Sequence, residues 1–489
     1  MLDKRLEMCM ELVGGEGIVC DIGTDHAHLA AELIKSGKCE KVIAADINEG
    51  PLEAAAKTVE KYGLSDRITL ILSDGLENVP LDNVSDVVIA GMGGETIAGI
   101  IGETTTGVIV NASIDKCDFE SIRWILQPMT KPEILRKWLI GNGFEIISET
   151  GVEENEKLYT VITARYSAVY KQLTGFEALR GFFRDDDEMG KKIRQKEAEK
   201  LNKVSQSLEK AGKLNESGHY AAMASRIHKG NEEVSISDIY SFLNEKYPFA
   251  LQEGWDNSGY LVESETGRCS KILLTLDITN DSIEEAVDKG AGLIISHHPV
   301  IFNPLKKVQT NNPVYKLIRN GTGAICMHTN LDIAEGGTNT AIVKKIAEKL
   351  AVSANIEPLE DCGLGCIIEF EKVIDCEEFA AILKDIFKID RIKTNIYGEY
   401  ILSKIAVCSG SGGSLWKLAK AKGCDALITG DVKHDIWIDT NNAKFTVFDC
   451  GHFHTENLVL EELRYALEKK FPQLDVEISE RSTDPCEYI

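Results

Sequence analysis

Four short apolar runs in the second half of the chain each lead into histidine and acidic residues. Short runs rich in β-branched residues predict buried strands, and open α/β sheets carry their chemistry at the ends of their strands. Imidazoles and carboxylates together are the usual ligands of a divalent metal. The sequence therefore predicts a metal site at one edge of one sheet. The runs are 293–295, 324–327, 426–428 and 445–448, and the polar residues that follow them are His297 and His298, His328 and Asp332, Asp431 and His434, and His452, His454 and Glu456.

The spacing of these residues limits how they bind metal. Adjacent His297 and His298 would point to opposite faces of a continuing strand. Both serve as ligands only if the chain turns there or if each binds a different ion, and two ions about 3.5–4 Å apart permit the second arrangement. His452 and Glu456 lie one helical turn apart, so a helix that starts there presents both on one face.

Residues 1–165 alternate between strand-like and helix-like runs. Such alternation predicts a parallel sheet with crossover helices. Two final runs are close enough for an antiparallel pair at the edge. The expected strands are 17–20, 42–45, 68–72, 86–90, 123–127, 144–149 and 159–164, and one expected helix covers 51–62.

The ends of the first five strands carry the residues of a nucleotide-type site. The first strand ends in Asp21-Ile22-Gly23-Thr24-Asp25-His26, where an acid, a glycine turn and a helix start follow one another. Asp46 ends the second strand, where a carboxylate accepts both hydroxyls of a ribose. Glycine near the fourth strand lets a planar base approach the backbone. The later strand ends are Asp74-Gly75, Gly91 to Gly94, and Gln127-Pro128.

Residues 166–230 lose the strand pattern and form the one basic segment of an acidic chain. The net charge is −24, yet residues 167–230 hold 13 Lys or Arg against 9 Asp or Glu. Apolar residues at threes and fours predict an amphipathic or short coiled-coil helix around Lys191–Lys210. This helix either binds RNA phosphates or is a solvated linker between two domains. A break is expected at Asn215–Gly218.

The length of 489 residues indicates two or three domains. The acidic balance argues against a protein that coats nucleic acid. No apolar run reaches the roughly eighteen residues of a membrane helix, and the start lacks an apolar signal core. The thirteen cysteines are scattered, many in apolar runs, which favours buried reduced thiols. A cytoplasmic location without membrane contact is expected.

Residues 1–165 resemble the TrmK family of bacterial tRNA methyltransferases, which methylate N1 of adenine 22 with S-adenosylmethionine. The stretches that carry the resemblance are DIGTDHAHL, DGL, IAGMGG and LQP. The resemblance implies that Asp21, Gly23, Thr24 and Asp25 shape the methionine end, Asp46 the ribose, and Asp74 and Gly75 the adenine. Gly91 is a further candidate for cofactor binding, because backbone without side chains there lets a planar base approach. Asp25 and His26 are candidate catalytic contacts to the target adenine, although His26 equally fits a residue that caps or packs the helix start. The basic helix is implied to touch tRNA.

Residues 231–489 resemble the Nif-three-like dinuclear-metal-centre family, the GTP cyclohydrolase I type 2 homologues. The stretches are GWDNSG, SHHPVIF, HTNLD, ITGDVKHD and DCGHFHTE. The resemblance implies a homo-hexamer with two divalent metals per subunit, zinc, iron or manganese. It assigns His297, His298, Asp332, His452 and Glu456 as ligands, with His298 and Asp332 on one ion and His297 and His452 on the other. Asp431 replaces a more usual glutamate.

These observations predict an α/β fusion protein. A class I, Rossmann-like methyltransferase domain (1–165) is followed by a helical linker (166–230) and a Nif-three-like metal domain (231–489). The expected functions are tRNA adenine-N1 methylation and metal-dependent hydrolysis of a nucleotide such as GTP. The alternative for the metal domain is a non-catalytic hexameric scaffold or a metal-trafficking module.

Overall fold

The computed structural model describes residues 2–15, 17–111, 120–352, 355–360, 363–396 and 401–486. The chain divides into two compact units. The first unit comprises Met1–Val204 and Met223–Gly230, and the second comprises Ser205–Ala222 and Asn231–Ile489. Each unit builds its own sheets and cores.

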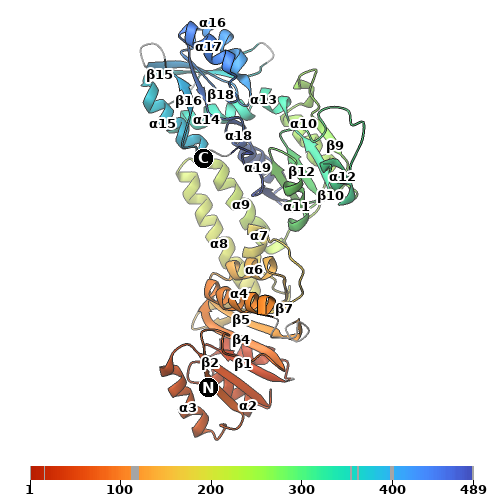
Figure 1. Ribbon diagram of the computed structural model, residues 1–489, viewed down its shortest axis with the longest axis vertical. Coiled ribbons are helices and arrows are strands. Elements are labelled where there is room, and N and C mark those ends of the chain that lie inside the picture. Colours follow the sequence, from red (N-terminus) through yellow and green to blue (C-terminus); the bar gives the residue numbers. More distant parts are fainter. Residues whose placement is uncertain are drawn as a thin grey trace. The chain divides into compact units, whose positions relative to one another are not determined.

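The first unit is a mixed α/β sheet of seven strands in the order β3-β2-β1-β4-β5-β7-β6. The first five strands of this order run parallel, and β6 and β7 add an antiparallel edge, as the sequence predicts. Figure 1 shows β1, β2, β4 and β5 in red and orange. The strands are β1 (Ile18–Ile22), β2 (Lys41–Asp46), β3 (Ile68–Leu72), β4 (Val84–Gly93), β5 (Arg123–Thr130), β6 (Phe144–Glu154) and β7 (Lys157–Tyr166).

Helices cover both faces of this sheet. Because successive strand residues face opposite sides, Val19 packs into one core and Cys20 into the other. The helices α1 (Lys4–Leu12), α2 (His28–Lys35) and α3 (Glu49–Lys61) share the core of Val19, and α4 (Gly94–Asn111) and α6 (Pro132–Gly141) share that of Cys20. The carboxyl ends of the parallel strands therefore stay open for a site.

The basic segment forms α7 (Gly175–Arg180), α8 (Glu188–Lys210) and α9 (Leu214–Lys229). The break expected at Asn215–Gly218 is wrong, because the chain turns at Gly212 instead, where φ is +75°. Gly218 lies inside α9, and a Cβ there would come within 2.6 Å of the Tyr465 ring. Glycine at this position thus serves close packing rather than a turn.

The second unit contains a five-stranded sheet in the order β20-β11-β12-β13-β9. Its helix α10 (Ile236–Lys246) begins directly after its N-cap residue, Ser235. A two-stranded pair, β8 (Val234–Ser235) and β10 (Arg268–Cys269), lies beside α10. The other elements are β9 (Gly259–Val262), β11 (Lys271–Thr275), β12 (Leu293–Ser296), β13 (Gly323–Cys326), β20 (Asp475–Ile478), α11 (Asn280–Lys289), α12 (Pro313–Arg319) and α19 (Val459–Lys470).

The second unit also contains a separate six-stranded sheet in the order β14-β15-β17-β18-β19-β16. The expectation that all metal-site strands share one sheet is therefore wrong, because β12 and β13 belong to the five-stranded sheet and β18 and β19 to this one. Figure 1 shows a labelled strand of each sheet, β12 in green and β18 in blue. The elements are β14 (Asn355–Pro358), β15 (Cys366–Asp375), β16 (Lys393–Asn395), β17 (Ile401–Val407), β18 (Ala426–Thr429), β19 (Thr446–Asp449), α14 (Thr338–Leu350), α15 (Cys376–Phe387), α16 (Trp416–Ala421) and α17 (His434–Ala443).

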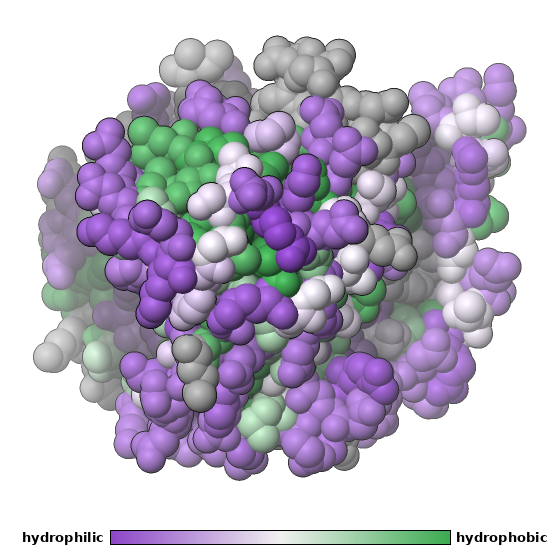
Figure 2. Space-filling view, turned by 90° about the horizontal axis from the view of Figure 1, so that it is seen from below, coloured by the Kyte–Doolittle hydropathy of each residue, from purple (hydrophilic) through white to green (hydrophobic). Residues whose placement is uncertain are grey.

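The described residues include no helix long and apolar enough to cross a membrane. The face shown in Figure 2 is mostly hydrophilic, with one concentrated hydrophobic area. Ten of the described cysteines are buried, and Cys486 is exposed. All of these eleven are free thiols.

Candidate active sites

The structure brings the five residues expected to bind metal together. His297 and His298 lie in a bend directly after β12, so the chain turns where two neighbouring imidazoles need it to turn. Asp332 lies in the short helix α13 (Thr329–Ile333) after β13, and α18 (His452–Asn457) after β19 supplies His452 and Glu456. The ends of two different sheets thus form one cluster.

Glu456 lies at the centre of this cluster. Its Oε2 is 3.1 Å from Nε2 of His298 and 3.1 Å from Nε2 of His452. Its Oε1 is 3.6 Å from Nε2 of His297, which is itself 3.7 Å from Oδ1 of Asp332. The distances favour a division opposite to the expected one, with His297 beside Asp332 and His298 beside His452.

Each of these histidines is held through its Nδ1 atom. Nδ1 of His297 donates to the carbonyl of Met327 at 2.8 Å. Nδ1 of His298 is 2.9 Å from Asp277, and Nδ1 of His452 is 2.8 Å from Asp431. A carbonyl or carboxylate behind the ring fixes the tautomer and leaves Nε2 as the ligand atom. The supporting position of Asp277 was not predicted, although Asp277 follows a strand as the candidate ligands do.

His328 adds a fourth imidazole to the cluster. Its Nδ1 is 2.7 Å from Oδ1 of Asp256, and it offers a ring nitrogen within 4.8 Å of ring nitrogens of His297 and His298. Burial raises the pKa of Asp256, but hydrogen bonds from His328 and Thr329 outweigh burial and hold it below its usual range. Asp256 is a further supporting residue that the sequence reasoning did not single out.

The chemistry of this donor set fits divalent cations. Nε2 of His297 is buried and makes no hydrogen bond within the described part of the chain. Burial raises the pKa of Glu456, but the charges and hydrogen bonds of the surrounding histidines outweigh it and hold that pKa well below its usual range. An anionic carboxylate that faces several imidazole nitrogens is a ready ligand set.

Two further histidines stand apart. His454 is 3.2 Å from Asp484 near the end of the chain. His434 begins α17 and is exposed. Neither is among the groups of described residues with metal-ligand spacing.

In the first unit, the loop after β1 bonds to the end of β2. The N–H groups of Gly23 and Thr24 donate to the carbonyl of Ala45 at 2.8 and 3.0 Å. Gly23 has φ +76°, and a Cβ there would come within 2.1 Å of Met92. The Thr24 hydroxyl donates to Asp21 at 2.7 Å. Burial is the main cause that raises the pKa of Asp21 to about 6.

Asp25 and His26 are exposed at the tip of this loop. His26 Nε2 lies 3.2 Å from Asp25, and the side chains are 52% and 83% exposed. His26 has φ +60°, and Ala27, which caps α2, has φ +53°. The His26 side chain does not cap the helix, although its ring stacks on that of His28 at 5.7 Å. Both residues are therefore accessible to a substrate.

The other predicted residues also lie at the carboxyl ends of the strands. Asp46 ends β2, and its carbonyl accepts from Ser73 just before the exposed Asp74. Gly75 has φ +52°, and a Cβ there would come within 2.9 Å of Ile100. Gly91 has φ +80° and open space around it. The backbone at β4 is therefore accessible to a flat ligand.

Arg5 was missed by the sequence reasoning. Its guanidinium donates to Gln127 at 3.1 Å, and the same Gln127 oxygen accepts from the N–H of Gly91 at 3.2 Å. Arg5 also lies 5.3 Å from the Tyr159 ring centre. No sequence pattern indicates that a single arginine in α1 contacts Gln127 and Tyr159 next to the strand ends.

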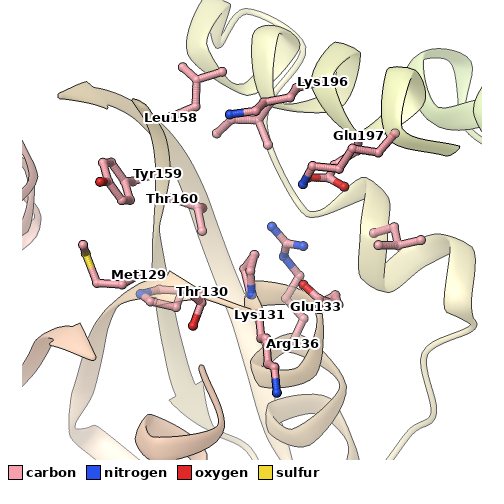
Figure 3. Close-up of a pocket in the computed structure, with 15 residues that line it drawn as sticks. Met129, Thr130, Lys131, Glu133, Arg136, Leu158, Tyr159, Thr160, Lys196 and Glu197 are labelled. Atoms are coloured by element: carbon pink, nitrogen blue, oxygen red, sulfur yellow. The ribbon is translucent and has the colours of Figure 1, made fainter. Parts of the chain in front are cut away.

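A pocket of about 380 Å³ lies beside these strand ends. Figure 3 shows Lys196 and Glu197 on α8 beside the strand segments that carry Met129 and Tyr159. Lys131 and Lys200 also line the pocket. Lys200 pairs with Glu197 and Lys131 with Glu95, whereas Lys196 makes no ion pair within the described residues. The pocket thus combines apolar walls with a cationic rim.

Arg136, which lines this pocket, belongs to a buried ion pair. Arg136 and Glu149 are in contact at 2.5 Å, with side chains 2% and 0% exposed. Glu149 also accepts from the N–H of Phe182 at 2.8 Å and from the Thr160 hydroxyl at 2.5 Å. Because Glu149 neutralises Arg136, and two of the pocket's lysines pair with acids, the positive charge offered to a ligand comes mainly from Lys196.

These geometries define a two-part α/β protein that joins a methyltransferase-type sheet to a histidine–carboxylate cluster. The chain belongs to the Duf34/NIF3 (NGG1p interacting factor 3) family, whose model matches residues 234–485. The model of the methyltransferase domain matches residues 2–162. The predicted fusion is therefore confirmed, and its methyltransferase domain implies S-adenosylmethionine as cofactor.

Known relatives cover the second half of the chain. A GTP cyclohydrolase 1 type 2 homolog of Clostridium acetobutylicum is 29% identical over 265 residues, which are 52% of this chain and 99% of the relative. One of Lactococcus lactis is 32% identical over 242 residues, 47% of this chain and 92% of the relative.

Solved structures resemble each half. A hypothetical protein of Staphylococcus aureus is 27% identical with a TM-score of 0.48 and covers 52% of this chain and 99% of its own. A Streptococcus pneumoniae protein provisionally described as a tRNA (m1A22) methyltransferase is 30% identical with a TM-score of 0.41 and covers 47% of this chain and 100% of its own.

Proposed function

We propose that the first unit methylates N1 of an adenine in tRNA, at the position equivalent to adenine 22. The observation that carries the proposal is the row of acids at neighbouring strand ends, Asp21, Asp46 and Asp74, next to the open backbone of Gly91. This row suits the ammonium, ribose and adenine of S-adenosylmethionine in turn. The sulfonium supplies an already activated methyl group.

The protein's part in this reaction is mainly orientation. Adenine N1 has a free lone pair, so no base has to remove a proton from it before transfer. Asp46 would accept the ribose hydroxyls, and Asp21 with Thr24 would hold the methionine end. Asp25 and His26 are exposed enough to contact the amine of the target adenine. The lysine-rimmed pocket would hold RNA phosphates beside the target.

Two measurements test this function. Purified chain should bind S-adenosylmethionine in calorimetry, and Asp46→Ala should weaken binding about tenfold or more because the hydroxyls lose a charged acceptor. Glu49→Ala, in the first turn of the following helix, is the matched control. The wild-type chain should also methylate a tRNA transcript with adenine at position 22 and not one with guanine there. Failure of the folded wild type to bind the cofactor would refute the site.

We propose that the second unit holds two divalent ions, zinc, iron or manganese, and hydrolyses a nucleotide such as GTP. His297 and Asp332 would hold one ion, His298 and His452 the other, and Glu456 would contact both. The orphaned Nε2 of His297 supports the proposal. Bound ions would supply Lewis acidity and an activated water. The supporting carboxylates Asp277 and Asp431 would keep the ligand nitrogens aimed at the ions.

The alternative is a homo-hexameric scaffold or metal-trafficking module, assembled through the second unit. Native mass spectrometry and elemental analysis of the purified chain measure subunit and metal numbers. Glu456→Gln should lower occupancy of both ions, and His452→Ala mainly of one, while the exposed His434→Ala should change neither. Full occupancy in Glu456→Gln would exclude the bridging role. If the wild type turns over GTP and the metal-ligand variants do not, the second unit is an enzyme. If the wild type assembles but does not turn over GTP, the scaffold is favoured.

A further inference from the structure

Two exposed aromatic side chains lie beside the histidine cluster. Trp255 is 60% exposed and Phe302 47% exposed, and their ring centres are 6.0 Å apart. Both rings meet the edge or face of His328, at 6.0 and 6.4 Å. The His328 ring is in turn 5.3 Å from that of His297. The aromatic pair therefore borders the proposed metal site directly.

The loops that carry these rings are fixed by hydrogen bonds. Asp256, next to Trp255, has a buried carboxylate that accepts from the N–H of Asn257 at 2.7 Å and from the hydroxyl of Thr329 at 2.5 Å. The same carboxylate holds Nδ1 of His328. Asn257 donates its side-chain amide to the carbonyl of Ile301, the residue before Phe302, at 2.5 Å. The chain next to each ring is thus held in place before any ligand arrives.

Exposed aromatic rings on a fixed frame favour a flat ligand. The two rings are tilted by 47° and do not stack on each other, so ring faces remain accessible. Aromatic faces bind nucleobases by stacking, with little dependence on the base. Lys306 and Lys307 are exposed in the same loop and offer positive charge in an otherwise acidic chain. A planar ring that carries an anionic group would suit the aromatic pair and the neighbouring metal site together.

We propose that Trp255 and Phe302 form the stacking site for the base of a nucleotide, with its phosphates toward the metal cluster. The inference rests on the proposed nucleotide substrate of the second unit and names the residues that would recognise its base. Trp255 and Phe302 are binding residues in this proposal, whereas Asp256 and Asn257 position them.

Binding of GTP, ATP and inorganic triphosphate to the metal-loaded full-length chain tests this proposal. Trp255→Ala and Phe302→Ala should weaken calorimetric binding of both nucleotides about tenfold and leave that of inorganic triphosphate unchanged. Trp255→Phe should retain most of the affinity, because it keeps a stacking face. Tyr62→Ala, an exposed aromatic residue in the first unit, is the matched control. Tryptophan fluorescence of the wild type should be quenched by the nucleotides, and this quenching should be lost in Trp255→Phe.

Several outcomes would overturn the stacking site. Equal affinities in wild type and Trp255→Ala would do so, as would absence of nucleotide binding by the metal-loaded wild type. A smaller native mass for Trp255→Ala would instead make the pair a contact between copies of the chain. If both nucleotides bind more tightly than inorganic triphosphate but GTP is not turned over, the stacking site is supported and the hydrolase is rejected. If GTP is turned over at the wild-type rate by both alanine variants, the hydrolase is supported and the stacking site is rejected.

Discussion

Asp277 holds the imidazole of His298 from the side opposite Glu456. Its Oδ1 is 2.9 Å from Nδ1 of His298, while Nε2 of the same ring is 3.1 Å from Glu456. Burial lowers the pKa of His298, but the hydrogen bonds to these two acids outweigh it and raise the pKa to about 10. Asp431 and Asp256 hold His452 and His328 in the same manner. The cluster is thus built in two layers, with acids behind the imidazoles.

The outer layer should control metal affinity. Asp277→Asn keeps the shape of the side chain but weakens the acceptor behind His298. We expect affinity for one ion to fall about 10- to 100-fold, measured by competition with a chelator. Asp281→Asn removes an exposed acid four residues further on and should have no effect. Equal metal affinity in Asp277→Asn and wild type would mean that His298 is oriented by Glu456 alone.

The individual strand ends of the second unit could be predicted, but not their arrangement in two sheets. His297, Asp332 and His452 each follow an apolar run, and the run itself marks the strand end. Which strands pair depends on contacts between distant parts of the chain. The run before His452 pairs with β18 and β16, not with β12 or β13. Local pattern therefore located the candidate ligands, and long-range packing decides how they meet.

Asp21 should make the stability of the first unit depend on pH. Its pKa is raised from 3.8 to about 6 in the folded protein, so the folded state binds more protons than the unfolded state between these values. Stability from this group is therefore lost as pH rises from about 4 to about 6. Asp21→Asn removes the cost of ionising a buried carboxyl. The free energy of unfolding of Asp21→Asn, measured in urea, should therefore rise relative to that of the wild type by about 1–2 kcal/mol between pH 4.5 and pH 8.

A difference between Asp21→Asn and wild type that stays constant over this pH range would contradict the assignment. Asp25→Asn is the control, since the Asp25 side chain is 83% exposed and should show no such growth.

In the first unit, some features could be predicted from the sequence and others could not. Strand ends and glycine turns could be located because period and turn chemistry are local. Arg5 and the Arg136–Glu149 pair could not, because one charged residue in an amphipathic helix is normally solvent-exposed. Only the folded structure brings Arg136 next to Glu149 of β6 and buries its guanidinium.

Breaking the buried pair should unfold the first unit more readily. Arg136→Met leaves Glu149 buried without its cation, and the free energy of unfolding should fall by about 3–5 kcal/mol. Lys191→Met breaks the exposed pair with Glu188 and should change the free energy of unfolding far less, because water screens that pair. Urea unfolding of both variants measures the difference. A loss below about 1 kcal/mol for Arg136→Met would show that water reaches Glu149.

The lysines of α8 should contribute to tRNA binding through charge alone. Lys196 and Lys200 are one turn apart and both line the pocket beside β5 and β7, so they meet the same stretch of a bound strand. Each phosphate contact releases about one counterion, so Lys196→Gln with Lys200→Gln should weaken tRNA binding and lower the salt slope of log K by about 1–2. Lys191→Gln on the same helix does not line the pocket and should leave the slope near that of the wild type. Filter binding between 50 and 200 mM salt measures both quantities, a range over which phosphate contacts produce large changes in affinity.

If the double variant keeps the wild-type affinity and slope, α8 is a linker helix, and the RNA must bind elsewhere on the first unit. If affinity falls but the slope does not, the lysines act by packing the pocket wall instead of by pairing with phosphates.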